Sequence, residues 1–235
     1  MYIAAVVSGD KALQAVFQTG ENFHSAIAHK VFNLDCDISE VAEKYGELRQ
    51  ACKAISFGIL YGASAQKIAD SADISLERAQ NTIDDYFGTF WQLKKWLTET
   101  QNFIKQNAYV YSPLGRKRRL PNAKSTDRSV SGHEVRSGVN SIIQSVSSDI
   151  NLMGAVETNE WIKSNNLDIK IFALVHDSVL AEVREDLVDI YSEKLKELIQ
   201  KDRGVSIPGT PVGCDFDVAD DYSLGKFEKF YADRL

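Results

Sequence analysis

The chain has 235 residues, enough to bury one large core or two modest ones. Hydrophobic residues make up 44% and charged residues 26%, which is ordinary for a soluble globular protein. The net charge of −6 argues against a general nucleic-acid binder. The three cysteines show no zinc spacing, no apolar run is long enough to span a membrane, and no signal peptide is evident. We therefore expect free thiols, no membrane contact and a cytosolic location.

The first half of the chain is predicted to be almost entirely helical. Residues 1–8 are apolar and read as structured from the start, without a polar lead-in. Helices are expected over residues 10–17, 22–32, 48–62, 64–72, 75–87 and 90–106 from apolar spacing, capping residues and glycine stops. The last of these helices is expected to pack Trp91, Leu93, Trp96, Leu97 and Ile104 inward.

The predicted helix 48–62 carries a stripe of residues at four-residue spacing: Arg49, Lys53, Phe57 and Tyr61. At helical rise the stripe is roughly 18 Å long. Its cations lie at the N-terminal end, where the helix dipole also favours anions, and its aromatic rings lie at the other end. Phosphates followed by a base is the layout of a nucleoside triphosphate. The same spacing also fits an amphipathic helix with a solvated basic edge, so the pattern alone leaves both interpretations open.

A β-hairpin is predicted over residues 109–121, where the helical period gives way to alternation and turn residues. Its second strand carries Arg116, Lys117, Arg118 and Arg119. From Lys105 to Arg136 there are eight Lys or Arg against two acids. A local basic strip in an acidic chain favours a phosphate-binding surface for nucleic acid. The alternative is a solvated charge run that protects an edge strand.

A long helix, or a broken pair of helices, is predicted over residues 131–162. Arg136, Asn140 and Gln144 project from it at four-residue spacing, beside a face of Val and Ile residues. Polar groups surrounded by so much apolar surface need partners, and side-chain amides suit contacts with the minor groove or a template edge. Hydrogen bonds to neighbouring backbone are the alternative.

A second hairpin is predicted over residues 169–183, and its apolar runs indicate that it is buried. His176 and Asp177 lie in its tight turn, where the Asp177 carboxylate either caps the turn or binds a metal. An amphipathic helix is expected over residues 186–200. A last short strand follows residues 208–214, and residues 215–235 form an acidic tail with aromatic residues.

Taken together, these motifs resemble the C-terminal part of a family A DNA polymerase, of the DNA polymerase I type, including viral members. The stripe Arg49-x3-Lys53-x3-Phe57-Gly58-x2-Tyr61-Gly62 resembles the family's fingers helix, and Gly115 to Pro121 resembles its basic hairpin. The resemblance implies an α+β fold with a helical fingers subdomain and part of the antiparallel-sheet palm of a right-hand polymerase. It divides the chain into a palm remnant (1–11), fingers (12–128) and C-terminal palm (129–235).

Site residues follow from this resemblance. Arg49, Lys53 and His24 would approach the triphosphate, with Lys53 as a candidate catalytic proton donor to pyrophosphate. Phe57 would stack on the nucleotide and Tyr61 would guard the templating position. Asp177 would be catalytic and bind Mg²⁺. Contacts with DNA are expected from the following residues: Arg116, Lys117, Arg118, Arg136, Asn140, Gln144 and His176.

The implied activity is DNA-templated addition of deoxynucleotides to a primer 3′ end, with primer–template DNA and dNTPs as partners, in a bacterial or virus-infected cytoplasm. Such transfer uses two metal ions held between carboxylates. The family's other catalytic carboxylate lies in a strand that this sequence begins just after. We therefore expect the chain to need an N-terminal polymerase fragment or upstream domain and to be inactive alone. A truncated gene model, a split gene of viral type or a fragment would each explain this. The alternative is a non-catalytic accessory subunit that binds primer–template.

Overall fold

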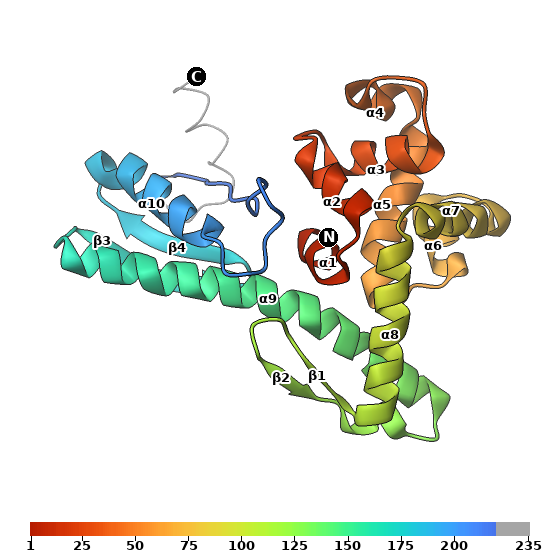
Figure 1. The fold of residues 1–235 in the computed structure, drawn as a ribbon. Coiled ribbons are helices and arrows are strands. Elements are labelled where there is room, and N and C mark those ends of the chain that lie inside the picture. The colour runs from red at the N-terminus through yellow and green to blue at the C-terminus, as the bar shows by residue number, and fades with distance from the viewer. Residues whose placement is uncertain (220–235) are drawn as a thin grey trace. The chain divides into compact units, whose positions relative to one another are not determined.

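The structure, a computed structural model, describes residues 1–219, apart from the side chains of residues 59–61 (Figure 1). The described residues are mostly helical, with two small antiparallel sheets, which confirms the expected α+β class. They divide into two compact units. The first contains residues 1–150 and 202–211, and the second contains residues 151–201 and 212–219 of the described chain.

Six helices of the first unit lie where helices were predicted: α2 (Lys11–Gln18), α3 (Phe23–Phe32), α5 (Gly46–Tyr61), α6 (Ala65–Ala72), α7 (Leu76–Thr89) and α8 (Trp91–Asn107). Three further helical elements were not predicted: α1 (Tyr2–Ser8), the 3-10 turn η1 (Ile38–Glu40) and α4 (Val41–Lys44). Asp10, Asn22, Ser64 and Ser75 each accept a backbone N–H in the first turn of the helix that follows, which satisfies an otherwise orphaned donor.

Buried Asp10 joins two of these helices. Its Oδ1 accepts the Leu13 N–H at 2.9 Å, and its Oδ2 accepts the Leu93 N–H at 3.0 Å. One carboxylate therefore satisfies the N-terminal backbone of both α2 and α8. Segment 202–211 is held against α1 by two hydrogen bonds of Tyr2. The Tyr2 hydroxyl donates to the Thr210 carbonyl at 2.6 Å and accepts the Ile207 N–H at 2.9 Å.

The predicted basic hairpin is present, with β1 (Tyr109–Tyr111) paired to β2 (Lys117–Arg119) and Tyr109 opposite Arg119. The turn η2 (Pro121–Lys124) leads into α9 (Arg128–Ser164), a single helix of 37 residues and not a broken pair. Gly138 of α9 lies against α8 and the end of the hairpin. A Cβ there would stand 2.5 Å from Leu120 Cδ1 and 2.8 Å from Ile104 Cδ1, so only glycine allows this approach.

The second unit packs the last part of α9 with β3 (Ile169–Val175), β4 (Ser178–Val183), the turn η3 (Glu185–Leu187) and α10 (Val188–Gln200). Its buried centre comprises Ile162, Ile169, Tyr191 and Leu195. Gly154 brings α9 against the backbone of α10, since a Cβ there would lie 3.2 Å from Ile199 Cα.

Two packing expectations and one expected strand were wrong. Trp91 is 59% exposed, because it is the first residue of α8 and precedes the buried face that starts at Leu93. Hairpin β3–β4 is largely exposed: Phe172 is 62% and Leu174 46% exposed, since the described chain covers only one face of this two-stranded sheet. Residues 211–219 form no strand. Residues 220–235 of the predicted acidic tail lie outside the described residues.

None of the described helices is both long and apolar enough to cross a bilayer.

Candidate functional site

Arg49 is held at the N-terminal end of α3. Its Nε donates to Ser25 Oγ at 3.1 Å and its Nη2 donates to Asn22 Oδ1 at 3.3 Å. Asn22 is also the cap of α3, so the guanidinium lies beside a helix start whose dipole favours anions. Neither partner was predicted, because nothing local in the sequence links residues 22–25 to residue 49. These partners are one hydroxyl and one amide, both neutral, so neither neutralises the Arg49 charge.

His24 lies near Arg49 and Lys53 of α5 and near the ring of Phe57. Burial of the imidazole, followed by the nearby charges of Arg49 and Lys53, lowers the pKa of His24 below its ordinary value. Its Nδ1 is buried and has no hydrogen-bond partner among the described residues. A buried nitrogen without a hydrogen bond destabilises the structure, so this position favours a ligand that can bond to the nitrogen or bring negative charge.

Phe57 completes this group. Its ring is 57% exposed, and its centroid lies 5.5 Å from that of His24. Further rings continue the series, with Phe23 at 5.2 Å from His24 and Phe17 stacked on Phe23 at 4.6 Å. The described structure thus brings together His24, Arg49, Lys53 and Phe57. The Tyr61 side chain lies outside the described residues.

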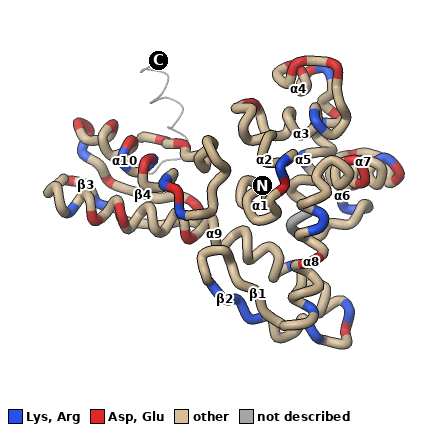
Figure 2. The backbone as a smooth tube through the Cα atoms, in the orientation of Figure 1, with Lys and Arg blue, Asp and Glu red and all other residues tan. Residues whose placement is uncertain are grey.

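All three residues of β2 are exposed cations, and Figure 2 shows the blue of Lys and Arg along this strand. Lys117 Nζ lies 4.2 Å from the centroid of Tyr109 and 5.3 Å from that of Tyr111, so cation–π contacts hold it on one face of the hairpin. Arg118 Nη2 donates to Ser137 Oγ of α9 at 3.1 Å. These contacts orient the cations and neutralise neither of them.

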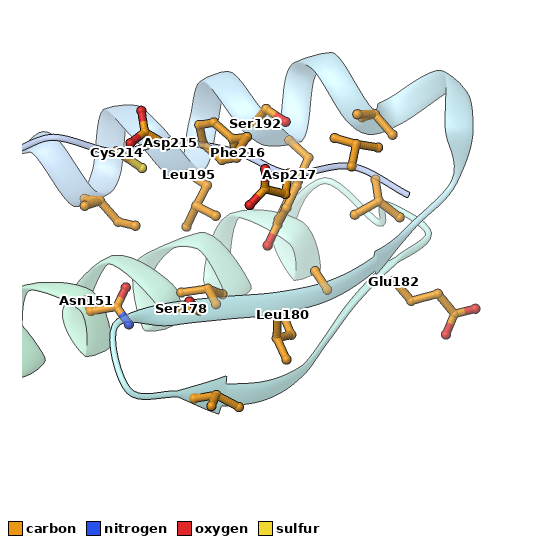
Figure 3. Close-up of a pocket in the computed structure, with 18 of the residues that line it drawn as sticks. Asn151, Ser178, Leu180, Glu182, Ser192, Leu195, Cys214, Asp215, Phe216 and Asp217 are labelled. Carbon is orange, nitrogen blue, oxygen red and sulfur yellow. The ribbon is translucent and has the colours of Figure 1, made fainter. Parts of the chain in front are cut away.

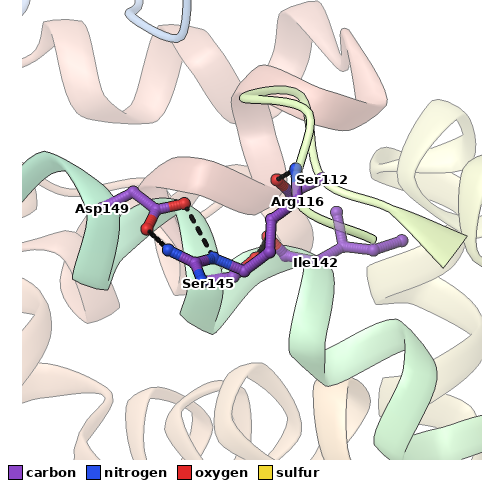
Figure 4. Close-up of polar contacts among 5 residues, drawn as sticks. All are labelled: Ser112, Arg116, Ile142, Ser145 and Asp149. Atoms are coloured by element: carbon purple, nitrogen blue, oxygen red, sulfur yellow. Dashed lines mark hydrogen bonds and ion pairs between the residues drawn. The ribbon is translucent and has the colours of Figure 1, made fainter. Parts of the chain in front are cut away.

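Arg116 differs, because it forms an ion pair with Asp149 of α9 (Figure 4). Its Nε donates to Asp149 Oδ2 at 3.2 Å, and its Nη2 donates to Oδ1. Ser112 fixes the base of the side chain, since its Oγ accepts the Arg116 backbone N–H at 3.2 Å. Asp149 was not predicted as a site residue. It lies 33 positions away in the sequence, and no local pattern marks the pairing.

The predicted polar row on α9 faces outward from the apolar side of that helix. Arg136 and Gln144 are exposed and Asn140 is half-buried. No hydrogen bond ties the Asn140 or Gln144 amide to any described group, so the expected alternative of backbone bonding is absent in this part of the chain. The end of α5 lies against the same row, because a Cβ at Gly62 would overlap the Arg136 side chain.

In the second unit, His176 and Asp177 form the exposed turn between β3 and β4, and His176 adopts a left-handed backbone with φ of 55°. Behind the turn is a cavity of about 590 Å³ between β4, α10 and residues 214–219 (Figure 3). Asp177 and Asp217 contribute to its lining, as does Tyr191. The Tyr191 hydroxyl is buried without a partner among the described residues, and burial raises its pKa to about 12.

The side chains at this turn do not make a complete metal site. Among the described residues, no three His, Cys, Asp or Glu side chains are grouped to hold an ion. Asp177 offers a single exposed carboxylate, whereas a divalent cation of the Mg²⁺ type is usually bound through several oxygens. A cation at Asp177 would therefore need donors from outside this part of the chain.

Comparison with known proteins places these features in a family. The model of DNA polymerase family A matches residues 1–223. The DNA polymerase of Escherichia phage T5 is 48% identical over 258 residues, covering 97% of this chain and 30% of that protein. DNA polymerase I of Caldicellulosiruptor bescii is 32% identical over 206 residues, covering 88% of this chain and 24% of that protein.

A solved structure, described as the POL domain of Pol1 from M. smegmatis in complex with DNA primer-template and dNTP, superposes with a TM-score of 0.79. It is 31% identical to this chain and is matched over 91% of this chain and 36% of its own length. The chain therefore spans less than a third of the length of each of the two DNA polymerases compared above.

Proposed function

Because the chain belongs to DNA polymerase family A, we propose that it binds the incoming nucleotide and the duplex in DNA-templated DNA synthesis. The reaction is the addition of a deoxynucleotide to a primer 3′ end with release of pyrophosphate. The observation that carries the proposal is the group on α3 and α5, where two cations, an exposed ring and a buried imidazole nitrogen without a hydrogen-bond partner among the described residues lie together.

The nucleotide would lie along α5, with its phosphates at Arg49 and Lys53 and its sugar and base at Phe57. Each charge-assisted hydrogen bond to a phosphate would stabilise the complex by about 1.5–3 kcal/mol. At the other end, the exposed Phe57 ring offers an apolar face on which the sugar and base could pack. His24 lies beside the same cations: burial lowers its pKa first and the charges of Arg49 and Lys53 lower it further, so an anion bound there would offset only this second effect. Lys53 would donate a proton to the departing pyrophosphate.

The duplex would contact the basic hairpin and the polar row of α9. Arg116, Lys117 and Arg118 would bind phosphates, since they are exposed cations on one short strand and its turn. Arg136, Asn140 and Gln144 would reach base edges from the minor groove, where unbonded amides find acceptors and donors. The similarity to a polymerase domain solved with DNA primer-template and dNTP supports both assignments.

Asp177 would provide one carboxylate for Mg²⁺, which when bound stabilises the charge that develops on the transferred phosphoryl group. The remaining donors would come from a partner polypeptide, such as an N-terminal polymerase fragment or an upstream domain. Two features support a partner at this place: the exposed apolar residues Phe172 and Leu174 of β3, and the cavity that Asp177 and Asp217 help to line. We propose that catalysis requires this partner and that His176 contacts DNA beside Asp177.

A nucleotide-binding titration tests the proposal. The chain, primer–template DNA and Mg²⁺ are titrated with the dNTP that pairs with the next template base, and with a mismatched dNTP. We expect tighter binding of the matched dNTP, and a loss of about tenfold or more in Arg49→Ala or Lys53→Ala. Lys67→Ala, an exposed lysine of α6, is the matched control and should not change the affinity.

An accessory subunit would give a different result. It would bind primer–template but show no Mg²⁺-dependent dNTP affinity, and Arg49→Ala would then have no effect on any binding step. Primer extension by the isolated chain that is abolished by Asp177→Ala would refute the requirement for a partner while leaving nucleotide binding intact.

A further inference from the structure

Among the described residues, Asp149 is the acid that forms an ion pair with the basic hairpin, through Arg116, and the burial of this pair is uneven. Its side chain is 12% exposed, whereas that of Arg116 is 59% exposed. The carboxylate is therefore largely covered at its place on α9, while the guanidinium that it binds is mostly exposed to solvent. Both Asp149 oxygens accept from Arg116, through Nε and Nη2, which is a planar two-point contact.

We infer that Asp149 is a positioning residue, which holds the Arg116 guanidinium in the orientation that contacts a phosphate of the primer–template duplex. This inference rests on the proposed function. The two-point contact uses the Nε edge of the guanidinium and leaves the Nη1 hydrogens and the second Nη2 hydrogen for a ligand. A flexible side chain is thereby fixed before DNA arrives, so less rotamer entropy is lost when it binds.

The opposite role for Asp149 is that of a competitor. A carboxylate that neutralises Arg116 would repel the duplex, and removing it would strengthen binding by about twofold at moderate salt. Positioning predicts the reverse sign, because the guanidinium would lose its fixed orientation. The largely covered carboxylate, and the bond that holds the Arg116 backbone at Ser112 Oγ, favour positioning. The sign of the change in affinity therefore separates the two roles.

The test is primer–template binding by fluorescence anisotropy, with the full chain and several salt concentrations. We expect Arg116→Ala to weaken binding about tenfold and to reduce the salt slope by about 0.9. Asp149→Asn should weaken binding nearly as much, and the double variant should bind no more weakly than Arg116→Ala. Glu134→Gln removes an acid from the same helix without touching Arg116, and it should bind as well as the parent chain or slightly better.

Tighter binding by Asp149→Asn, or additive losses in the double variant, would overturn the inference and leave the proposed function standing. A parent chain that does not bind primer–template would instead overturn the proposed function, and this inference with it. Thermal melting checks that each variant folds. If Asp149→Asn does not fold, Arg116→Lys decides, because it keeps the charge and the carboxylate but loses the planar contact. Binding equal to the parent chain would then refute positioning, and a loss of more than about threefold would support it.

Discussion

Gly138→Ala should destabilise the first unit, although alanine is the better helix former. The position is inside α9, where the change gains about 1 kcal/mol of helix propensity. The added Cβ would stand 2.5 Å from Leu120 Cδ1 and 2.8 Å from Ile104 Cδ1. Both neighbours are essentially fully buried, at 1% and 0% exposure, so neither can move into free space. Overpacking of this kind costs about 1–3 kcal/mol, which leaves a net loss of about 1 kcal/mol.

Gly132→Ala is the matched control in the same helix. Its Cβ would meet only the Arg136 Nη1 atom at 3.2 Å, the far end of a flexible and exposed side chain. The propensity gain then remains, and we expect stabilisation by up to about 1 kcal/mol. The two glycine-to-alanine changes should therefore differ by about 2 kcal/mol in the free energy of unfolding, with opposite signs.

Hydrogen exchange followed by mass spectrometry across a urea series is the suitable assay. Two compact units make a single unfolding signal ambiguous, whereas peptides from α8 and the β1–β2 hairpin report on the contact around Gly138 itself. Gly138→Ala should shift the midpoint for these peptides to lower urea and leave peptides from α10 unchanged. Equal stabilisation by both variants would refute the close approach of α9 to Leu120 and Ile104.

Three further substitutions and one proton-uptake measurement have defined outcomes. Asp10→Ala leaves the Leu13 and Leu93 N–H groups without their acceptor, and it should lower the free energy of unfolding of the first unit by about 2–4 kcal/mol in chemical denaturation. The pKa of His24 is lowered in the folded state, so its contribution to the free energy of unfolding is fully present above the unfolded-state pKa of 6.5 and is lost as the pH falls through the folded-state pKa. His24→Asn should therefore reduce the loss of thermal stability at acidic pH, as measured in thermal melts. Because a bound triphosphate would offset Arg49 and Lys53, dNTP binding below pH 6.5 should take up a proton, which calorimetry in buffers of different ionisation enthalpy would detect. Lys117→Ala should weaken primer–template binding and reduce its salt slope by about 0.9.

Helix positions were largely predictable because their signals are local. The caps at Asp10, Asn22, Ser64 and Ser75 lie within three residues of the N–H groups that they accept, so spacing in the sequence reveals them. The stripe on α5 was likewise legible, since four-residue spacing is set by helical geometry alone.

The hydrogen-bond partners of Arg49 and Arg116 could not be predicted from the sequence, because they come from elements distant in the chain. Ser25 and Asn22 reach Arg49 only after α3 packs beside α5, and Asp149 reaches Arg116 across 33 positions. The burial of β3–β4 was misjudged for a related reason. An apolar strand indicates that something covers it, but not whether the cover is part of the described chain, and Phe172 remains exposed there.

The first part of α9 shows how packing and binding constrain one helix together. One side carries Val135, Val139, Ile142 and Val146, all buried, and Gly138 lets that side approach α8 and the hairpin closely. The other side therefore cannot turn inward, and Asn140 and Gln144 keep their amides unbonded among the described residues. The same rigid attachment fixes the distance from this polar row to β2, where Arg118 donates to Ser137. A surface that must match the fixed spacing of a duplex needs such rigidity, so loss of packing at Gly138 should weaken primer–template binding even though that residue touches no ligand.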